Sequence, residues 1–168
     1  DLYDHLKGIE YLNFIADVYG ISVEKREELI KKYADIFEIT KNLGDIISSY
    51  SHGMKQKITI MAALVHNPKV WILDEPLTGL DPNSIFQVKE CMKQHAAEGN
   101  IVFFSSHIID IVEKLCERIA IIKKGHIKCV KTLKEIEESG TTLEKFYMDI
   151  INGSEEIPTE YIEDTKNA

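Results

Sequence analysis

The sequence predicts an α/β protein in which a helical lobe over residues 1–66 precedes parallel strands that alternate with helices. Two observations indicate this class. Up to Pro68, apolar residues recur with the period of an α-helix, and beyond it two short, continuous apolar runs are each followed by a helix-forming segment. The 168 residues suit one domain or two closely packed lobes.

Three helices are expected in the lobe. The first should end at Gly20 in a left-handed conformation, the second should start after the N-cap Ser22, and the third should cover 51–65 and stop before Pro68. Their apolar stripes predict a buried set consisting of Ile9, Leu12, Ile15 or Ala16, Tyr19, Leu29, Ile30, Tyr33, Ile36, Phe37, Ile58, Met61, Ala62 and Val65.

The second part predicts a parallel sheet. Val70–Leu73 and Ile101–Phe104 are apolar throughout, as in strands buried on both faces. Asp81 followed by Pro82 predicts a helix that ends near Glu98, and a second helix is expected over 108–117. Segments 118–122 and 127–130 predict a hairpin, turning at Gly125, that completes the sheet.

Two short helices are expected to follow, over 132–138 and 142–151, the second opened by a capping box of Thr141 and Glu144. The last fifteen residues are acidic and poor in apolar groups, and we expect them to be mobile. The expected organisation is therefore a helical subdomain at 1–66, an α/β core at 67–131, and short helices with an acidic tail at 132–168.

Composition excludes several classes of function. The chain has 20 Lys and Arg against 28 Asp and Glu, a net charge of −8, so nucleic acid is not expected as a partner. No apolar run approaches the roughly 20 residues of a membrane-spanning helix. The three cysteines form no C-x-x-C pattern, which argues against a zinc site or a disulfide framework and suits a reducing cytosol.

Polar residues follow both predicted strands: Asp74 and Glu75 after the first, and Ser105, Ser106 and His107 after the second. The carboxyl ends of parallel strands share one crevice, so Asp74, Glu75 and His107 should converge there. Adjacent carboxylates in such a place favour a metal ion or a cationic partner. The alternative is that these residues only cap the strand end and the next helix.

A third polar cluster lies where the third helix begins. Ser51, His52 and Gly53 combine a hydroxyl, a glycine backbone and unpaired amides at a positive helix end, which suits a phosphate oxygen. Taken by itself, a serine before a helix is more often only an N-cap.

These segments, in order, resemble the nucleotide-binding domain of ATP-binding cassette (ABC) transporters. The resemblance runs from near Leu6 to about Val130 and rests on Tyr-Ser-His-Gly-Met at 50–54, Trp-Ile-Leu-Asp-Glu-Pro at 71–76, Thr-Gly-Leu-Asp-Pro at 78–82 and Ser-Ser-His at 105–107. It implies part of a P-loop NTPase (RecA-like) core together with the ABC α-helical subdomain.

The resemblance also implies roles for the site residues. Asp74, at the end of a Walker B strand, would hold Mg²⁺ through water, and Glu75 would be the catalytic glutamate. His107 matches the switch histidine that contacts the γ-phosphate of ATP, and Asp81 lies in the D-loop. The implied cofactors are ATP and Mg²⁺.

Residues 50–54 resemble the signature motif, through which one subunit completes the nucleotide site of another. The family more usually has Leu-Ser-Gly-Gly-Gln, whereas this chain has His52 for the first glycine and Met54 for the glutamine. The variant resembles that of exporter-type cassettes. It leaves open whether His52 contacts phosphate or faces solvent, and we favour solvent.

The phosphate-binding pattern G-x-x-x-x-G-K-[ST] occurs nowhere in the 168 residues. The resemblance begins after the family's glutamine loop, so we expect the chain to be the C-terminal portion of such a domain, inactive as an ATPase by itself. Strand edges left open by a missing half of the sheet should make this chain self-associate or rearrange.

The resemblance implies the ATP-hydrolysing subunit of a membrane exporter. Its partners would be a transmembrane permease subunit and a second nucleotide-binding domain, and it would lie in the cytoplasm against the inner face of the membrane. The alternatives are a soluble ABC-type ATPase of DNA repair or translation, and a non-catalytic module. The acidic composition and the lack of a coiled-coil insertion argue against DNA repair, and the intact Asp74, Glu75 and His107 argue against a non-catalytic module.

Overall fold

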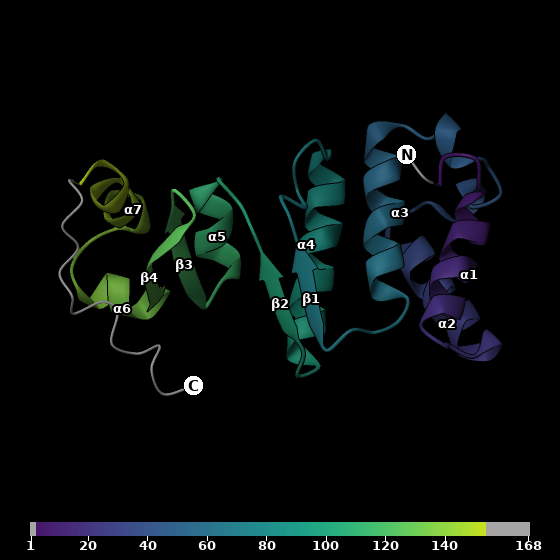
Figure 1. Ribbon diagram of the computed structural model, residues 1–168, viewed down its shortest axis with the longest axis horizontal. Coiled ribbons are helices and arrows are strands. Elements are labelled where there is room, and N and C mark those ends of the chain that lie inside the picture. Colours follow the sequence, from purple (N-terminus) through teal and green to yellow (C-terminus); the bar gives the residue numbers. More distant parts are fainter. Residues whose placement is uncertain (1–2, 154–168) are drawn as a thin grey trace. The chain divides into compact units, whose positions relative to one another are not determined.

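The computed structural model describes residues 3–153. These residues form two compact units that divide between Ser105 and Ser106 (Figure 1). The acidic tail that was expected to be mobile lies outside the described residues. The division at 66 and 131 stays a prediction.

The first unit opens with the expected helices: α1 (Gly8–Val18), α2 (Val23–Ile36) and α3 (His52–Leu64), with the 3₁₀ turns η1 (Thr40–Asn42) and η2 (Ile47–Ser49) between the last two. The chain leaves α1 through Gly20 at a φ of 66°, as predicted. Ser22 is confirmed as the N-cap of α2, because its hydroxyl accepts a hydrogen bond from the amide of Lys25 at 3.3 Å.

Most of the predicted helical core is confirmed. The buried members of the predicted set are Leu12, Ala16, Leu29, Ile30, Tyr33, Phe37, Ile58, Met61, Ala62 and Val65. The prediction for Tyr19 is wrong. Its side chain is exposed and stacks on the ring of His66, with centroids 3.8 Å apart, so the aromatic pair lies at the edge of the lobe instead of in its centre.

The α/β part of this unit consists of β1 (Val70–Leu73), α4 (Pro82–Ala97) and β2 (Ile101–Phe104). Both strands have the predicted bounds and pair in parallel, with Val70 opposite Ile101 and Leu73 opposite Phe104. Such a parallel pair needs a crossover, which α4 supplies. The parallel α/β prediction is therefore confirmed.

The expectation that both faces of these strands are buried is wrong for one face. Trp71 is buried and meets the ring of His95, on α4, edge to face at 5.6 Å. The residues whose side chains point to the opposite face are about half exposed or more: Val70, Ile72, Ile101 and Phe103. Within residues 3–105 this sheet has two strands, and no element of this unit buries that second face.

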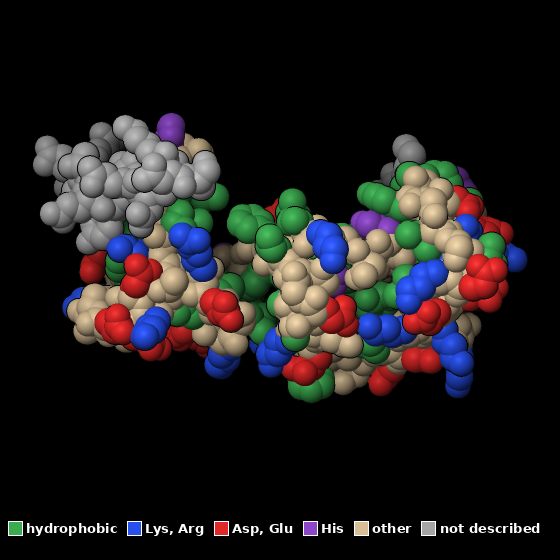
Figure 2. Space-filling view, turned by 90° about the horizontal axis from the view of Figure 1, so that it is seen from below, with side chains coloured by type: hydrophobic (Ala, Val, Ile, Leu, Met, Phe, Trp, Pro, Cys, Tyr) green, Lys and Arg blue, Asp and Glu red, His purple; other side chains and the backbone are tan. Residues whose placement is uncertain are grey.

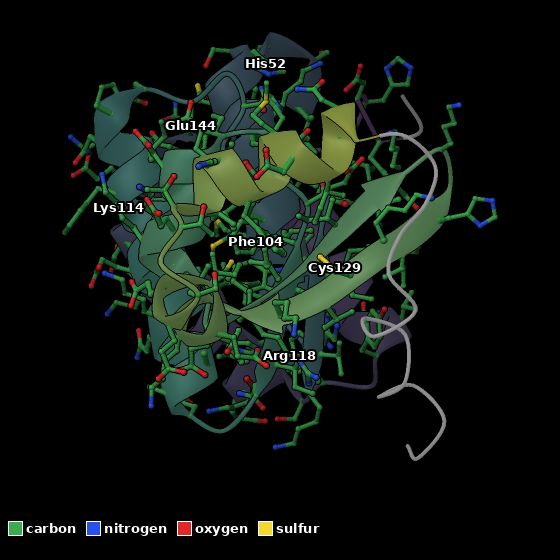
Figure 3. The ribbon with its side chains drawn as sticks, turned by 90° about the vertical axis from the view of Figure 1, so that its left-hand side faces the viewer. His52, Phe104, Lys114, Arg118, Cys129 and Glu144 are labelled. Carbon is green, nitrogen blue, oxygen red and sulfur yellow. The ribbon has the colours of Figure 1, made fainter. Side chains whose placement is uncertain are left out.

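The second unit contains α5 (Ile109–Leu115), β3 (Arg118–Lys123), β4 (His126–Thr132), α6 (Leu133–Glu138) and α7 (Leu143–Asn152). The predicted hairpin is confirmed, and Lys124 and Gly125 form its turn with φ of 51° and 76°. Its apolar cluster includes Cys129, labelled on the strand in Figure 3.

The hairpin does not complete the parallel sheet, contrary to the prediction. β3 and β4 form a two-stranded antiparallel sheet of their own, whose core consists of Ile119, Ile121, Cys129, Ile136 and Leu143. Apolar side chains from α5 and α7 pack against this core.

The start of α7 corrects another detail. Thr142, not Thr141, is the N-cap, and its hydroxyl accepts a hydrogen bond from the amide of Lys145 at 3.2 Å. The capping box predicted for Thr141 and Glu144 is therefore wrong. A capping box does open α6, where Thr132 and Glu135 satisfy each other's backbone amides.

In the part of the chain that the structure describes, no helix is both long and apolar enough to cross a bilayer. All three cysteines are free, and burial raises the pKa of the Cys91 thiol to about 11, which keeps it protonated. On the face shown in Figure 2, acidic and basic side chains are interspersed, and the described residues form no continuous basic patch there.

Candidate functional site

The two acidic residues after β1 are held by the strand next to it. The hydroxyl of Ser105, the first residue after β2, donates to Oδ1 of Asp74 at 2.5 Å and accepts from the amide of Glu75 at 3.0 Å. The amide of Ser105 in turn donates to the carbonyl of Leu73 at 3.0 Å. The carboxyl ends of both strands therefore converge, as the sequence predicts for a parallel pair.

Glu75 has a backbone conformation that few non-glycine residues adopt. Its φ is 44°, and the amide of Thr78 closes the following turn by donating to its carbonyl at 3.2 Å. The Thr78 hydroxyl lies 3.4 Å from Oε2 of the Glu75 side chain. Residues with positive φ are held only where the surroundings impose the conformation, and such strain occurs often at functional sites.

The predicted phosphate-binding segment begins α3. Ser51 is its N-cap, and the Ser51 hydroxyl accepts from the amide of Met54 at 3.3 Å. The amides of His52 and Gly53 lie in the first turn, where a helix offers no acceptor for them. A Cβ added to Gly53 would meet no atom within 4 Å, so this turn is open on that side. The capping interpretation is confirmed for Ser51, and phosphate binding stays a prediction.

His52 is exposed, yet its ring lies against the backbone of Gly79. A Cβ built on Gly79 would come within 2.8 Å of the Nε2 atom of His52. One turn further along α3, Nε2 of Gln56 donates to the carbonyl of Pro76 at 3.4 Å. The beginning of α3 thus contacts the segment that follows Glu75.

Asp81 caps α4. Its carboxylate accepts from the amides of Asn83 and Ser84 at 3.0 and 3.1 Å and from the Ser84 hydroxyl. The hydrogen bond from that hydroxyl, followed by those from the two amides, holds the pKa of Asp81 below its ordinary value. Its place among nucleotide-contacting residues stays a prediction.

His107 belongs to the second unit, just before α5. It is exposed, and beside it the amide of Ile108 donates to the hydroxyl of Ser106 at 3.1 Å. That His107 meets Asp74 and Glu75 is still a prediction.

Asp74 suits magnesium chemically. The ion keeps several waters and needs only one or two protein carboxylates, which a single strand-end aspartate can supply. Among residues 3–153 no group of three or more His, Cys, Asp or Glu side chains could form an all-protein metal cage. The described donors therefore fit a hydrated ion shared with a phosphate better than a structural metal.

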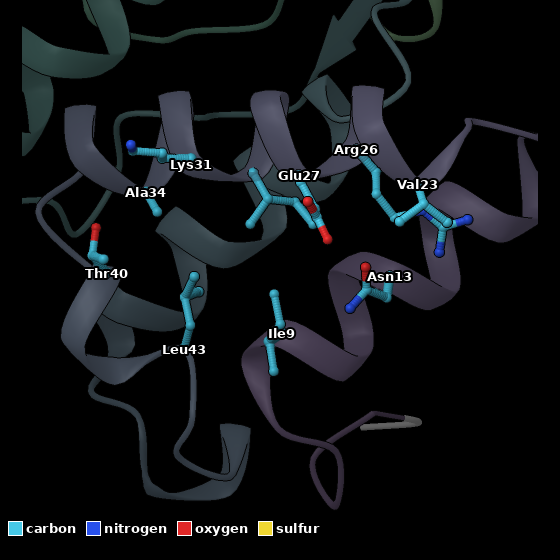
Figure 4. Close-up of a pocket in the computed structure, with 10 residues that line it drawn as sticks. Ile9, Asn13, Val23, Arg26, Glu27, Lys31, Ala34, Thr40 and Leu43 are labelled. Carbon is cyan, nitrogen blue, oxygen red and sulfur yellow. The ribbon is translucent and has the colours of Figure 1, made fainter.

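A separate cavity of about 630 Å³ lies between α1 and α2 (Figure 4). Its lining includes the apolar Ile9, Ile30 and Leu43 and the charged Arg26 and Lys31. None of the residues predicted for catalysis or phosphate binding lines it, so it is not part of the candidate site.

Sequence reasoning missed three contributors to the site: Ser105 as a bridge, Gln56 and Gly79. The signal for Ser105 was available, because a hydroxyl directly after the neighbouring parallel strand lies opposite Asp74. Gln56 could have been found from its place four residues after His52, on the same helix face. Gly79 carried no signal beyond a glycine in a turn.

Comparison with known proteins points to one family. The family model described as ABC transporter matches residues 6–78. The chain is 37% identical over 138 residues to the linearmycin resistance ATP-binding protein LnrL of Bacillus subtilis, covering 80% of this chain and 43% of that one. It is 31% identical over 152 residues to the bacitracin transport ATP-binding protein BcrA of Enterococcus faecalis, covering 90% and 48%.

A solved structure, an ATP-binding subunit of an ABC transporter, superposes with a TM-score of 0.84 at 31% identity, over 89% of this chain and 64% of that one. The chain spans about half the length of the first curated relatives that it matches. The α/β fold is thus of the P-loop NTPase type, and the helices α1–α3 precede the parallel strands in the sequence. With its sequence relatives and its structural neighbour in agreement, the chain belongs to the family of ABC transporter ATP-binding proteins.

Proposed function

We propose that the protein containing this chain hydrolyses Mg-ATP and couples the reaction to export across a membrane. The observation that carries the proposal is the Ser105 hydroxyl, which fixes the carboxylate of Asp74 and the backbone of Glu75 at one strand end. The hydroxyl binds the side chain of Asp74 but only the backbone of Glu75. One acidic residue can therefore bind a metal ion while the other transfers a proton.

Asp74 would hold Mg²⁺ through water, and the bound ion would neutralise charge on the phosphate oxygens. Glu75 would orient the attacking water and accept its proton, a role worth about 10² to 10⁴ in rate. His107 would donate to the terminal phosphate, where negative charge develops. Each of these three residues acts on a different part of the reaction.

A second nucleotide-binding domain would face the beginning of α3. Behind the N-cap Ser51, the first-turn backbone amides of His52 and Gly53 offer a positive helix end to the phosphate of the partner's nucleotide. Asp81 would lie at the same interface, in the D-loop. A head-to-tail dimer would then contain two such sites.

Export is supported by the signature variant and by the name of the relative LnrL, which is a resistance protein. The helical lobe would meet a transmembrane permease subunit and keep the protein at the cytoplasmic face of the membrane. The 168 residues by themselves contain no phosphate-binding G-x-x-x-x-G-K-[ST] pattern, so we propose that this chain alone binds ATP weakly and hydrolyses it negligibly.

The test is steady-state ATPase activity of the full-length protein with Glu75→Gln. This change keeps the size of the side chain and removes the base, so kcat should fall by about 10²-fold or more. The matched control is Glu90→Gln on α4, where an exposed pair with Lys93 contributes little. Unchanged kcat in Glu75→Gln, or equal losses in both variants, would contradict the proposal.

A further inference from the structure

The His52 ring occupies the space beside Gly79 that a side chain would otherwise fill. A Cβ on Gly79 would come within 2.8 Å of Nε2 and 2.9 Å of Cδ2 of that ring, and the φ of Gly79 is 76°. Separations this short are essentially never seen for real Cβ atoms. The φ favours glycine at 79, and an added Cβ there would push the exposed His52 ring out of its place.

A second contact joins the same two segments. His52 and Gln56 are one helical turn apart, so they lie on one face of α3. The His52 ring packs on Gly79, and the side-chain amide of Gln56 donates from Nε2 to the carbonyl of Pro76 at 3.4 Å. One helix face thus holds both ends of residues 76–79.

Residues 76–79 connect Glu75 to the cap of α4. Pro76 and Leu77 are buried, so the connection is packed and not a loose loop. Glu75 has a positive φ, its amide is bound by the Ser105 hydroxyl, and its carbonyl leads directly into this packed segment. A shift of the segment would therefore change the direction of the Glu75 side chain.

We propose that His52 is a positioning residue: its ring, seated on Gly79 and assisted by Gln56, holds residues 76–79 and thereby directs Glu75. The inference rests on the proposed function for its catalytic consequence, but the contact itself does not. It assigns the His52 side chain a role inside its own subunit, different from both phosphate binding by that side chain and simple exposure to solvent.

The first test is a double-mutant cycle on the thermal stability of the full-length protein. Gly79→Ala introduces a strained φ and displaces the His52 ring, so the contact between the two residues is already lost in that variant. Adding His52→Ala to Gly79→Ala should therefore cost less stability than His52→Ala costs in the unsubstituted protein. Gly20→Ala is the matched control, because Gly20 has a φ of 66° and nothing within 4 Å of an added Cβ. Its effect should simply add to that of His52→Ala.

The second test separates positioning from phosphate binding by kinetics. Misplacing Glu75 should lower kcat about tenfold in His52→Ala while KM for ATP stays unchanged. His52→Phe keeps a flat ring against Gly79 but cannot hydrogen-bond a phosphate, so it should restore most of the lost kcat. His52→Gln, which can hydrogen-bond but has no ring, should not.

Three results would overturn the proposal. They are additive stability effects at 52 and 79, a His52→Ala variant with unchanged kcat, and a loss in His52→Phe as large as that in His52→Ala. Absence of ATPase activity in the unsubstituted protein would overturn the proposed function, and the stability cycle would still decide whether His52 holds the segment.

Discussion

At the scale of single residues, the hydroxyl of Ser105 acts in two directions. It donates to the Asp74 carboxylate and accepts from the Glu75 amide, so one side chain fixes two neighbouring residues to the adjacent strand. A carboxylate that accepts such a hydrogen bond has a defined orientation. The precision of the site thus comes from a residue that has no part in the proposed chemistry.

The cap of α4 gives a prediction about pH. The pKa of Asp81 is lowered first of all by the Ser84 hydroxyl. Since the folded-state pKa lies below the unfolded one, the stabilisation is present above the unfolded pKa of about 3.9 and is lost as pH falls through the folded pKa. Ser84→Ala should move the pKa of Asp81 up, and acid unfolding should begin at higher pH.

NMR titration of the Asp81 carboxyl carbon measures this shift. Asn83→Ala is the control, because it keeps the backbone amide that donates to Asp81 and should leave the pKa low. An equal pKa in Ser84→Ala and in the unsubstituted protein would contradict the assignment.

Which residues take part was largely predictable from sequence. Asp74 and Glu75 follow an apolar strand, and Ser51 and Asp81 are N-cap residue types directly before helices. The positive φ of Glu75 and the contact of His52 with Gly79 could not be predicted. Both arise where segments distant in sequence meet, and neither leaves a periodic pattern.

At the scale of elements, the strand positions could be predicted from local sequence. Val70–Leu73 and Ile101–Phe104 are continuous apolar runs that follow a proline or a glycine and end at polar residues. The start of α7 was misplaced by one residue, because Thr141 and Thr142 are both capable caps. The structure distinguishes them: Thr142 caps the helix, whereas the Thr141 hydroxyl is buried without a hydrogen-bond partner.

This difference predicts opposite effects of two neighbouring substitutions. Thr142→Ala removes the cap and should lower the free energy of unfolding by about 1 kcal/mol. Thr141→Val replaces an unpaired buried hydroxyl with a methyl group, so it should be neutral or stabilising. Urea denaturation measures both. Greater loss in Thr141→Val than in Thr142→Ala would show that the cap is misassigned.

At the scale of the whole molecule, no element of the first unit, over residues 3–105, covers the second face of β1 and β2. Strand identity was predictable because it depends on local sequence, whereas burial was not, because it depends on what packs against the strand. The hairpin illustrates the same limit: its turn at Lys124 and Gly125 is encoded locally, but its separation from the parallel sheet is not.

The open face of the sheet predicts how the 168-residue chain behaves in solution. Its exposed apolar side chains are continuous across both strands, with Ile72 70% and Phe103 57% exposed. Contiguous apolar surface of this kind favours association. The chain should therefore elute from size-exclusion chromatography, with light scattering, as dimers or larger species whose mass rises with concentration.

Replacing both Ile72 and Phe103 with Thr should shift the population towards monomer, because Thr keeps a high strand propensity while the apolar area is lost. Val18→Thr serves as the control, since Val18 is 64% exposed but lies at the end of α1, away from the sheet. It should leave the association unchanged. A concentration-independent monomer in the unsubstituted chain would show that the face is covered in solution, and equal effects of the sheet and control substitutions would assign the association to another surface.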